Sequence, residues 1–370
     1  MNSSAAATLR CWAEIDTGAL RYNAGIAAKK AVAGGKDRVI AVIKADGYGH
    51  GLQAVARALA EHVAVLAVAS VAEAGQLCGI VPGDRVLLLS PALPSELPAV
   101  IAGNFTASLS NIEEARALHA AALATNRKAR VNAVLDTGMG RMGALPADAA
   151  AFVREINSLA GLELISICSH YSSADEDAAF TSSQEKVFHE LSAVLPPAVR
   201  HIANSAAILG RSIPAMQMVR AGLMLYGVSP LPHLQAELRP AMAWKTRVGL
   251  VRELPAGWGV SYGRTCILTR PTLVATLTAG YGDGYPRHAS GKGAAVLIGG
   301  KRCPVLGRIT MDQIMVDASS VPLTAPGEEA VLLGCQGAER ITAHELAGLA
   351  DTIPWHLFTG ITTRTVRLYL

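Results

Sequence analysis

The sequence predicts an α/β protein in which an N-terminal (β/α)8 barrel is followed by a mostly β C-terminal domain. Three observations carry this prediction. A chain of 370 residues is too long for one ordinary core, so two domains are expected. Up to about residue 226, short apolar runs alternate with Ala/Leu/Glu-rich helical stretches. From residue 242 onward, long helical patterns are few and most of the sequence shows patterns typical of β-strands and turns.

Eight apolar or β-branched runs predict eight strands in the first domain. They are residues 39–43, 65–70, 85–90, 105–110, 130–135, 164–170, 201–204 and 218–226. Helices are expected at 52–61, 71–77, 95–101, 112–124, 147–159 and 183–194. Ser70 with Glu73, and Ser110 with Glu113, read as helix-starting caps. Eight strands alternating with helices favour a barrel, and an open doubly wound sheet is the alternative.

The second domain is expected to hold strands at 246–252, 272–277, 295–298, 308–316, 330–333 and 365–369. The two domains are placed at residues 12–235 and 236–370, with residues 1–11 as a lead-in and a linker at 233–238. A first strand at Cys11–Ile15 precedes the barrel pattern and is expected to pair with the second domain.

Composition narrows the class of protein. Hydrophobic residues make up 51% and charged residues 17%, as in a globular chain, and the net charge of 33 − 29 = +4 comes from scattered basic residues, so a nucleic-acid partner is not expected. No apolar window long enough for a membrane helix and no signal peptide are visible. The six scattered cysteines form no CxxC pair, which disfavours zinc and a disulfide framework; reduced thiols fit a cytoplasmic location.

Lys44 stands out in the first domain. It follows the apolar run 39–43, which reads as a strand buried on both faces, and it precedes a loop with Gly47, Gly49 and Gly51. Buried strands rarely end in an ammonium that has neither a partner nor a role. Burial lowers the pKa of a lysine, and a neutral amine can form a Schiff base. The alternative is a lysine that reaches solvent at the strand edge.

Further polar side chains fall at the same rim of the predicted barrel, after or at the ends of its strands. They are Asp136, Arg141, His170, Tyr171, His201, Asn204, Ser205, Arg220, Gly222 and Tyr226, the last three in the eighth strand. Taken singly, each reads equally well as a core histidine, a salt-bridged arginine or a turn glycine. Their convergence at the rim where barrel active sites lie predicts a site.

A phosphate site is expected near the seventh and eighth strands. The Ser205 hydroxyl and the backbone amides around Gly222 and Leu223 can donate hydrogen bonds there. No GxxxxGK[ST] or GxGxxG pattern follows a strand, which disfavours nucleotide binding.

Eight motifs in order along the chain resemble those of alanine racemases. They are IKADGYGHG (43–51), DTGMGRMG (136–143), SHYSSAD (169–175), HIANS (201–205), RAGLMLYG (220–227), VSYG (260–263), GYGDGYPR (280–287) and GRITMDQ (307–313). Members of that family are pyridoxal-phosphate enzymes with a barrel followed by a β domain. Each motif is moderately specific, and eight in the same order are strongly so.

The resemblance implies two catalytic residues. Lys44 would hold pyridoxal 5'-phosphate as an internal aldimine and act as the base for one enantiomer. Tyr262 would act on the opposite face, reaching across the interface of a homodimer with shared active sites. Racemisation needs both, because the α proton leaves one face of a planar carbanion and returns on the other. A phenol is a weak base, so a nearby cation must assist it. Without the resemblance, Tyr262 reads as a packing residue of the β domain.

The resemblance also implies how the cofactor and substrate are held. Arg220, supported by His201, would hydrogen-bond the pyridine nitrogen and keep it unprotonated, which weakens the electron sink and limits transamination. The other cofactor contacts would be Tyr48, Arg141, His170, Asn204, Ser205, Gly222, Leu223 and Trp355. Arg141 and the Met311 amide would contact the substrate carboxylate. Residues around the corridor for substrate would be Asp175, Tyr281, Arg287, Arg308 and Asp312, for which rim salt bridges or packing are the alternative. No metal is expected.

Two positions depart from the family pattern. Many members carry a carbamylated lysine two residues before the Asp of DTGMGR, where it orients the arginine; here that residue is Val134. We expect Asn132 (on the same strand face), a chloride ion or water to replace the carbamate. Near the C-terminus, Trp355 stands where the family usually has a tyrosine that touches the phosphate, which bears on substrate range.

The resemblance implies a cytosolic racemase that interconverts L- and D-alanine by two-base proton transfer and supplies D-alanine for peptidoglycan. A broader-specificity amino-acid or serine racemase is the nearest alternative, because Val134 and Trp355 both alter the pocket. A fold-related decarboxylase would share the barrel–β arrangement, but no matching motifs are present. A non-enzymatic pyridoxal-phosphate carrier would resemble the barrel alone, so the β domain with Tyr262 argues against it.

Overall fold

The computed structural model describes residues 8–31, 35–212 and 217–370. These residues form two compact units. The first holds the described parts of 18–47 and 51–239, and the second holds residues 8–17, Tyr48–His50 and Pro240–Leu370. Residues 1–7, on which the expected lack of a signal peptide partly rests, lie outside the described residues.

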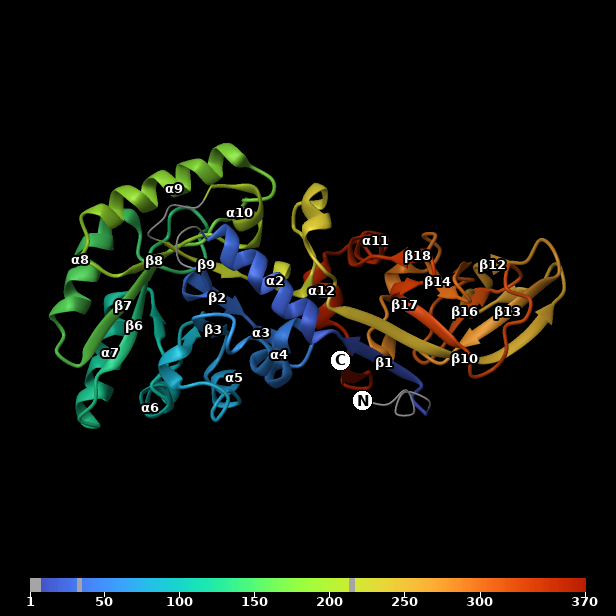
Figure 1. Cartoon of the computed structure of the whole chain (residues 1–370), viewed down its shortest axis with the longest axis horizontal. Coiled ribbons are helices and arrows are strands. Elements are labelled where there is room, and N and C mark those ends of the chain that lie inside the picture. Colours follow the sequence, from blue (N-terminus) through green and yellow to red (C-terminus); the bar gives the residue numbers. More distant parts are fainter. Residues whose placement is uncertain (1–7, 32–34, 213–216) are drawn as a thin grey trace. The chain divides into compact units, whose positions relative to one another are not determined.

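Eight parallel strands form the sheet of the first unit (Figure 1). They are β2 (Val39–Val42), β3 (Val65–Val68), β4 (Val86–Leu88), β5 (Ala107–Leu109), β6 (Ala129–Val134), β7 (Leu162–Cys168), β8 (Val199–His201) and β9 (Gln217–Ala221). Their order is β4-β3-β2-β9-β8-β7-β6-β5, and β4 meets the start of β5 through a parallel bridge between Leu87 and Thr106. The sheet therefore closes, which confirms the predicted barrel and excludes the open doubly wound sheet.

Helices follow the strands, and Figure 1 shows α7 and α8 beside β6 and β7. The helices of this unit are α2 (Thr17–Lys30), α4 (Leu52–Leu59), α5 (Val71–Gly75), α6 (Leu97–Ala102), α7 (Ile112–Ala124), α8 (Pro146–Ser158), α9 (Ala178–Ala193) and α10 (Ser205–Gly210). The predicted Ser70 cap is confirmed, since its hydroxyl accepts from the Glu73 amide. The predicted Ser110 cap is wrong, because Asn111 caps α7 and accepts from Glu114.

The eighth strand is shorter than predicted. β9 ends at Ala221, and the chain turns at Gly222 into the 3-10 helix η4 (Leu223–Tyr226). The Ser205 hydroxyl accepts hydrogen bonds from the Gly222 and Met224 amides, so these amides are satisfied without a strand partner. Tyr226 therefore lies in η4 and not in the strand, and its hydroxyl donates to the Val42 carbonyl at 3.1 Å.

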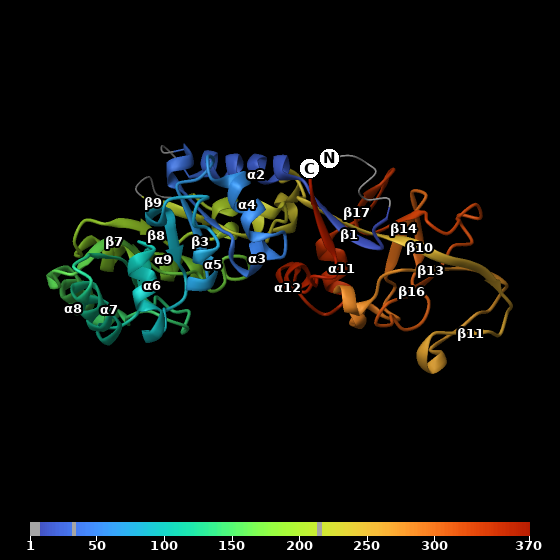
Figure 2. The same ribbon diagram turned by 90° about the horizontal axis from the view of Figure 1, so that it is seen from below.

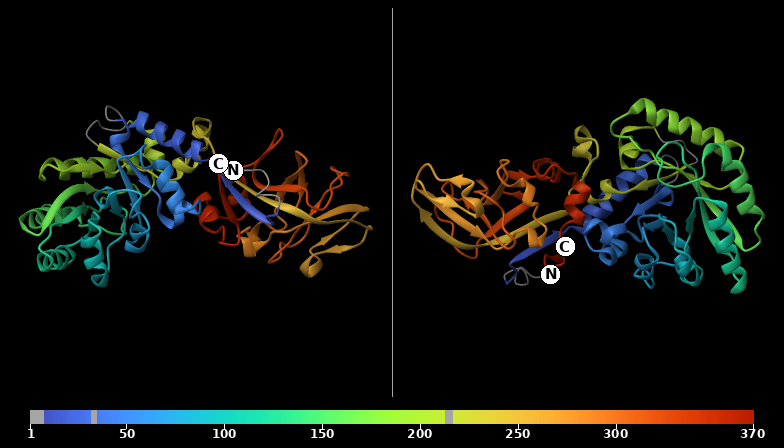
Figure 3. Two further views of the ribbon diagram at one scale, coloured as in Figure 1. Left: turned by 60° about the horizontal axis from the view of Figure 1, so that its bottom comes forward. Right: turned by 180° about the vertical axis from the view of Figure 1, so that it is seen from behind.

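The second unit is built around the long strand β10 (Met242–Leu254), which Figures 2 and 3 show running through it. β1 (Cys11–Ile15) pairs antiparallel with β10 and parallel with β19 (Val366–Tyr369). Further strands are β11 (Gly259–Val260), β12 (Cys266–Ile267), β13 (Thr272–Leu277), β14 (Ala295–Ile298), β15 (Lys301–Pro304), β16 (Ile314–Asp317), β17 (Glu329–Gln336) and β18 (Glu339–Ile341). Two short helices, α11 (Ala343–Leu349) and α12 (Pro354–Thr359), complete a mostly β unit, as predicted.

One predicted strand of this unit is largely a turn. Of residues 308–316 only the last three belong to β16. The Thr310 amide donates to the Gln313 carbonyl, and the Gln313 amide donates back to the Thr310 hydroxyl, which closes a tight turn before the strand. Among the described residues, no helix combines the length and apolar character that crossing a bilayer requires.

Candidate active site

Lys44 lies two residues after the end of β2 at Val42, at the start of a left-handed turn. This turn, α3 (Lys44–Tyr48), has φ angles of 54°, 54° and 60° at Ala45, Asp46 and Gly47. Left-handed geometry costs a non-glycine residue roughly 1–2 kcal/mol, so the turn must be held by its surroundings. The Asp46 carboxylate accepts from the Leu52 amide at 2.7 Å, and the Ala45 amide donates to a carboxylate oxygen of Glu73 at 2.7 Å.

Backbone strain is concentrated around two residues that the sequence singles out. Eight described residues other than glycine have positive φ. Three of them, Asn104, Asn126 and Asp351, lie elsewhere and are of the types that tolerate this geometry. The remaining five flank Lys44 or Tyr262: Ala45, Asp46, Tyr48, Ser261 and Arg264. Such strain is typical of functional sites, where the surrounding structure fixes an unfavourable conformation.

The half-buried Lys44 amine lies in a cationic environment. Burial lowers its pKa first, the charge of Arg141 lowers it further, and Arg220 adds a smaller effect in the same direction. The carboxylate of Glu73 acts in the opposite direction and raises the pKa. The net shift is downward, so this lysine gives up its proton more readily than an ordinary one and suits a nucleophile or a base.

Arg220, on β9, is buried at the centre of this group. Its Nη1 donates to Nδ1 of His201 at 2.6 Å and to the His201 carbonyl at 3.0 Å. Its Nη2 donates to Nδ1 of His170 and to the Ser169 carbonyl, both at 2.6 Å. No carboxylate forms an ion pair with Arg220 in the part of the chain that the structure describes. A buried cation without an anionic partner is unusual and favours a site for an anionic or electron-rich ligand.

The two histidines act as neutral acceptors. Because Arg220 always donates, each ring accepts on Nδ1 and carries its hydrogen on Nε2. Burial first, and the charge of Arg220 second, hold the pKa of both His170 and His201 well below the ordinary value of 6.5. The imidazoles therefore orient the guanidinium without adding charge to the site.

Acidification is expected to destabilise the barrel through His170 and His201. In the unfolded chain each imidazole takes up a proton as the pH falls through about 6.5, whereas the folded protein keeps both unprotonated to lower pH. The contribution of these histidines to the free energy of unfolding is thus fully present above about pH 6.5. Below pH 6.5 the free energy of unfolding decreases by up to about 1.4 kcal/mol per pH unit for each histidine, until the folded-state pKa is reached. Urea unfolding at about pH 7.5, 6.5 and 5.5 measures this. A His201→Gln variant should show a shallower fall, and a pH-independent free energy of unfolding in the unaltered protein would contradict the account.

Asp136 builds the loop that carries Arg141. One of its carboxylate oxygens accepts from the Gly138 and Met139 amides, and the other accepts from Gly140, at 2.8–2.9 Å. Gly143, with φ +111°, lies so close to the Asp136 amide that a Cβ there would be 2.8 Å from it. Asp136 is therefore a loop organiser, and Arg141 is presented from a fixed backbone beside Lys44 and Arg220.

A neutral hydrogen-bond network lies on β6 two residues before Val134, the residue that stands where the resemblance leads one to expect a carbamylated lysine. Val134 is buried, and Asn132 on the same strand donates through Nδ2 to Ser108 Oγ at 2.9 Å and to Cys168 Sγ at 3.2 Å. The Ser166 hydroxyl donates to its Oδ1 at 2.7 Å. Both amide hydrogens of Asn132 are thus used within the barrel. The sequence did not reveal the partners Ser108, Ser166 and Cys168, because they lie on two other strands, β5 and β7.

The loop after β8 gathers the expected phosphate ligands. Asn204 caps α10, its side chain accepting from the Ala207 amide at 3.1 Å. Ser205 begins that helix and accepts from the Gly222 amide at 3.0 Å, so Ser205 and Gly222 are in direct contact. Leu223 follows as the first residue of η4. The structure therefore brings Asn204, Ser205, Gly222 and Leu223 together at one end of the barrel.

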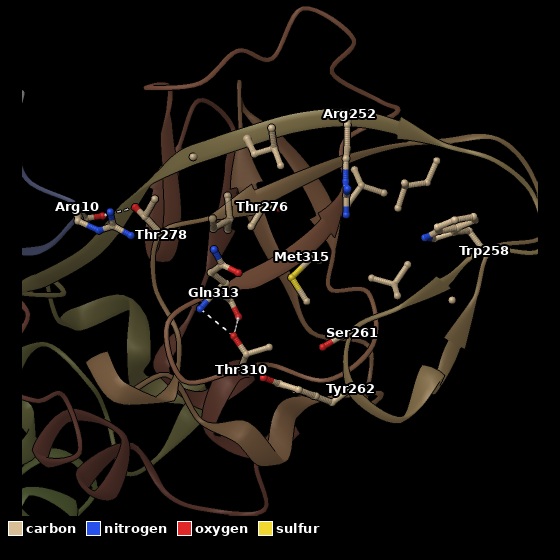
Figure 4. Close-up of a pocket in the computed structure, with 17 residues that line it drawn as sticks. Arg10, Arg252, Trp258, Ser261, Tyr262, Thr276, Thr278, Thr310, Gln313 and Met315 are labelled. Atoms are coloured by element: carbon tan, nitrogen blue, oxygen red, sulfur yellow. Dashed lines mark hydrogen bonds between the residues drawn. The ribbon is translucent and has the colours of Figure 1, made fainter.

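Tyr262 belongs to the second unit and is exposed, with 71% of its surface accessible. It lines a pocket of about 610 Å³ together with Ser261, Thr310, Gln313 and Met315 (Figure 4). The Ser261 hydroxyl donates to the Arg308 carbonyl at 2.5 Å, which ties the loop to the segment before β16. A Cβ on Gly263 would lie 3.0 Å from Nη1 of Arg308, so this guanidinium lies against the residue next to Tyr262.

The other predicted residues of the second unit occupy different settings. Tyr48 is buried, and burial raises its pKa to about 12, so its phenol stays protonated. Trp355 is half-buried on α12, and Met311 is 52% exposed in the turn before β16. The carbonyls of Thr310 and Met311 accept from the Tyr281 and Gly282 amides, and Asp312 forms an ion pair with Arg364 at 2.9 Å.

Three further residues expected around the substrate approach are exposed. Arg287 and Arg308 share a second pocket of the second unit, and Asp175 lies before α9 in the first unit.

Comparison with known proteins agrees with this architecture. Residues 15–230 match the alanine racemase N-terminal domain, and residues 241–369 match the alanine racemase C-terminal domain. The chain is 41% identical over 361 residues to an alanine racemase of Methylacidiphilum infernorum, covering 97% of this chain and 92% of that one. It is 42% identical to that of Symbiobacterium thermophilum, with 97% and 96% covered.

Solved structures with the same fold include the alanine racemase of Streptomyces coelicolor A3(2), with a TM-score of 0.90, 36% identity and 99% of each chain covered. The enzyme from the D-cycloserine-producing Streptomyces lavendulae gives 0.89, 36% identity and coverage of 98% and 97%. A closed barrel followed by a β unit, over nearly the full length of these isomerases, defines the class. The chain belongs to the alanine racemase family.

Proposed function

We propose that this protein interconverts L- and D-alanine with pyridoxal 5'-phosphate as cofactor. The observation that carries the proposal is the buried Arg220, bound to two neutral histidines and to no described carboxylate, beside a lysine whose pKa is lowered. The names of the relatives support alanine as the substrate.

The residues of the barrel fit the cofactor. Lys44 has a lowered pKa and would attach it covalently, and Arg220 would face the pyridine nitrogen as a donor that does not release its proton. Ser205, with the amides of Gly222 and Leu223 and the capping Asn204, would hold the phosphate, and His170 would complete the contacts from the barrel. The resemblance adds Tyr48 and Trp355, which belong to the second unit. When bound, the cofactor supplies the electron sink that makes the α proton of the amino acid acidic.

Lys44 and Tyr262 would move the proton. The cationic surroundings lower the pKa of the Lys44 amine, so it can accept the α proton on one face. Tyr262 would donate or accept on the other face, and the Arg308 guanidinium lies against Gly263, the residue next to it. Arg141 and the Met311 amide would hold the substrate carboxylate, and Asp175, Tyr281, Arg287, Arg308 and Asp312 would line its approach.

The exposed Tyr262 supports a homodimer with shared active sites. Its side chain lines an open pocket of the second unit, and it stands on a strained loop. We propose that it reaches the barrel of a second copy. The six cysteines are free in the structure, which fits a cytoplasmic protein that supplies D-alanine for peptidoglycan.

The test is formation of D-alanine from L-alanine by the purified protein with pyridoxal phosphate, detected with D-amino-acid oxidase. L-Serine is assayed beside it. Rapid turnover of alanine and little of serine is expected. Equal turnover of both would favour the broader-specificity racemase, and no turnover of alanine would overturn the proposal.

A further inference from the structure

Glu73 connects two neighbouring strand ends of the barrel. It lies on α5, after β3, and its Oε2 accepts from the Ala69 amide at 2.8 Å. Its Oε1 accepts from the Ala45 amide at 2.7 Å, on the turn after β2. The Glu73 amide donates to the Ser70 hydroxyl at 3.2 Å, which fixes the backbone from which the Glu73 side chain extends. One carboxylate thus ties the residue after Lys44 to the end of the adjacent strand.

The same local motif occurs a second time without this connection. After β5, the Ser110 amide donates to Oε2 of Glu114 at 2.7 Å, and Glu114 donates through its amide to the capping Asn111 at 2.8 Å. The other oxygen of Glu114 accepts from Nδ2 of Asn111, its own cap, at 3.1 Å. The Glu114 side chain therefore stabilises only the start of its own helix, α7. The Glu73 side chain stabilises the start of α5 in the same way and also holds the turn that carries Lys44.

Glu73 is also the carboxylate whose charge acts on Lys44. The charged groups acting on the lysine are Arg141 from the loop after β6, Arg220 from β9 and Glu73 from α5. His170, which follows β7, feels the charge of Lys44 in turn but is itself neutral, because burial and both arginines lower its pKa. Two cations and one carboxylate therefore surround the amine. The carboxylate is the group that limits how far the lysine is deprotonated.

We propose that Glu73 is a positioning residue for Lys44: its carboxylate holds the left-handed turn through the Ala45 amide and presents a negative charge to the lysine amine. The inference rests on the proposed role of Lys44 as the residue that attaches pyridoxal phosphate. Two consequences follow. Without the charge, the Lys44 pKa falls further, because only the lowering influences remain. Without the hydrogen bond, the strained turn relaxes and the amine loses its fixed position.

The experiment follows attachment of pyridoxal phosphate to the cofactor-stripped full-length protein across a range of pH. The product is reduced with borohydride, and the modified Lys44 peptide is quantified by mass spectrometry. The rate rises with the fraction of neutral amine, so its pH midpoint reports the Lys44 pKa and its plateau reports the amine's position. The proteins compared are the unaltered protein, Glu73→Gln, Glu73→Asp and the matched control Glu114→Gln.

Glu73→Gln is expected to move the midpoint to lower pH and to reduce the plateau by about fivefold or more, since one amide oxygen cannot serve both backbone donors. Glu73→Asp keeps the charge but is too short to span both amides, so its plateau should fall while its midpoint stays near that of the unaltered protein. Glu114→Gln should match the unaltered protein in both. A Glu73→Gln protein that matches Glu114→Gln in midpoint and plateau would overturn the inference. No modification of Lys44 in the unaltered protein would instead overturn the proposed role of Lys44.

Discussion

Replacing Lys44 with alanine is expected to lower the racemisation rate by about a thousandfold or more and to abolish covalent attachment of pyridoxal phosphate. The reason is that the amine has two roles: it forms the bond to the cofactor, and it is the base on one face. Its lowered pKa, caused by burial and then by Arg141, fits both. The measurements are alanine racemisation and mass spectrometry after borohydride reduction.

The matched control is Lys36→Ala. Lys36 is an exposed lysine of the same unit whose ammonium donates to the Glu61 carbonyl, outside the site. It should keep unaltered rates and unaltered cofactor attachment. A Lys44→Ala protein with more than about a tenth of the original rate would remove Lys44 from the chemistry.

Replacing Tyr262 with phenylalanine is expected to keep the cofactor bound and to lower racemisation by about a thousandfold. With Lys44 intact, the α proton of one enantiomer should still exchange in heavy water, but the proton should return to the same face. The other enantiomer should neither exchange nor racemise. NMR of each alanine enantiomer in heavy water distinguishes exchange from inversion.

This substitution should not affect folding. The Tyr262 side chain is largely exposed, and no hydrogen bond of its hydroxyl occurs among the described residues, so removing the oxygen should leave the melting temperature unchanged. Tyr22→Phe serves as the control, since that ring lies under the Arg239 guanidinium in the first unit and has no role in the site. Unchanged racemisation of both enantiomers in Tyr262→Phe would exclude it as a base.

The barrel was predictable because most of its strands are short apolar runs flanked by turn or capping residues. The exception is β8, Val-Arg-His at Val199–His201, which the predicted run 201–204 overlaps only at His201. The same patterns gave β13 and β14 with their observed bounds. The position of Lys44 followed from chemistry, since an ammonium after a buried strand needs a reason. The rule that barrel sites lie after strand ends placed Arg141, His170, His201 and Arg220 on one rim, and the structure brings these four side chains together.

Features that depend on contacts between distant segments were not predictable from the residues. The end of β9 at Ala221 depends on the Ser205 hydroxyl, supplied by another loop. The start of α9 at Ala178, before the predicted residue 183, is different in kind, because its Asp177 cap is a local signal that the sequence contains and the prediction missed. Tyr262 carries no pattern of its own, because an exposed tyrosine on a strained loop has no periodicity. Glu73 read as an ordinary cap partner, and only its second oxygen, on Ala45, distinguishes it from Glu114.

We propose that each active site combines Lys44 of one subunit with Tyr262 of the other. Mixing the inactive Lys44→Ala and Tyr262→Phe proteins, with subunit exchange allowed and heterodimers counted by native mass spectrometry, tests it most directly. In a symmetric dimer with shared sites, each heterodimer has one site with both residues intact, so a fully exchanged equal mixture should regain about a quarter of the unaltered racemase activity. Abundant heterodimers without recovered activity would show that both residues act within one chain and would contradict the claim.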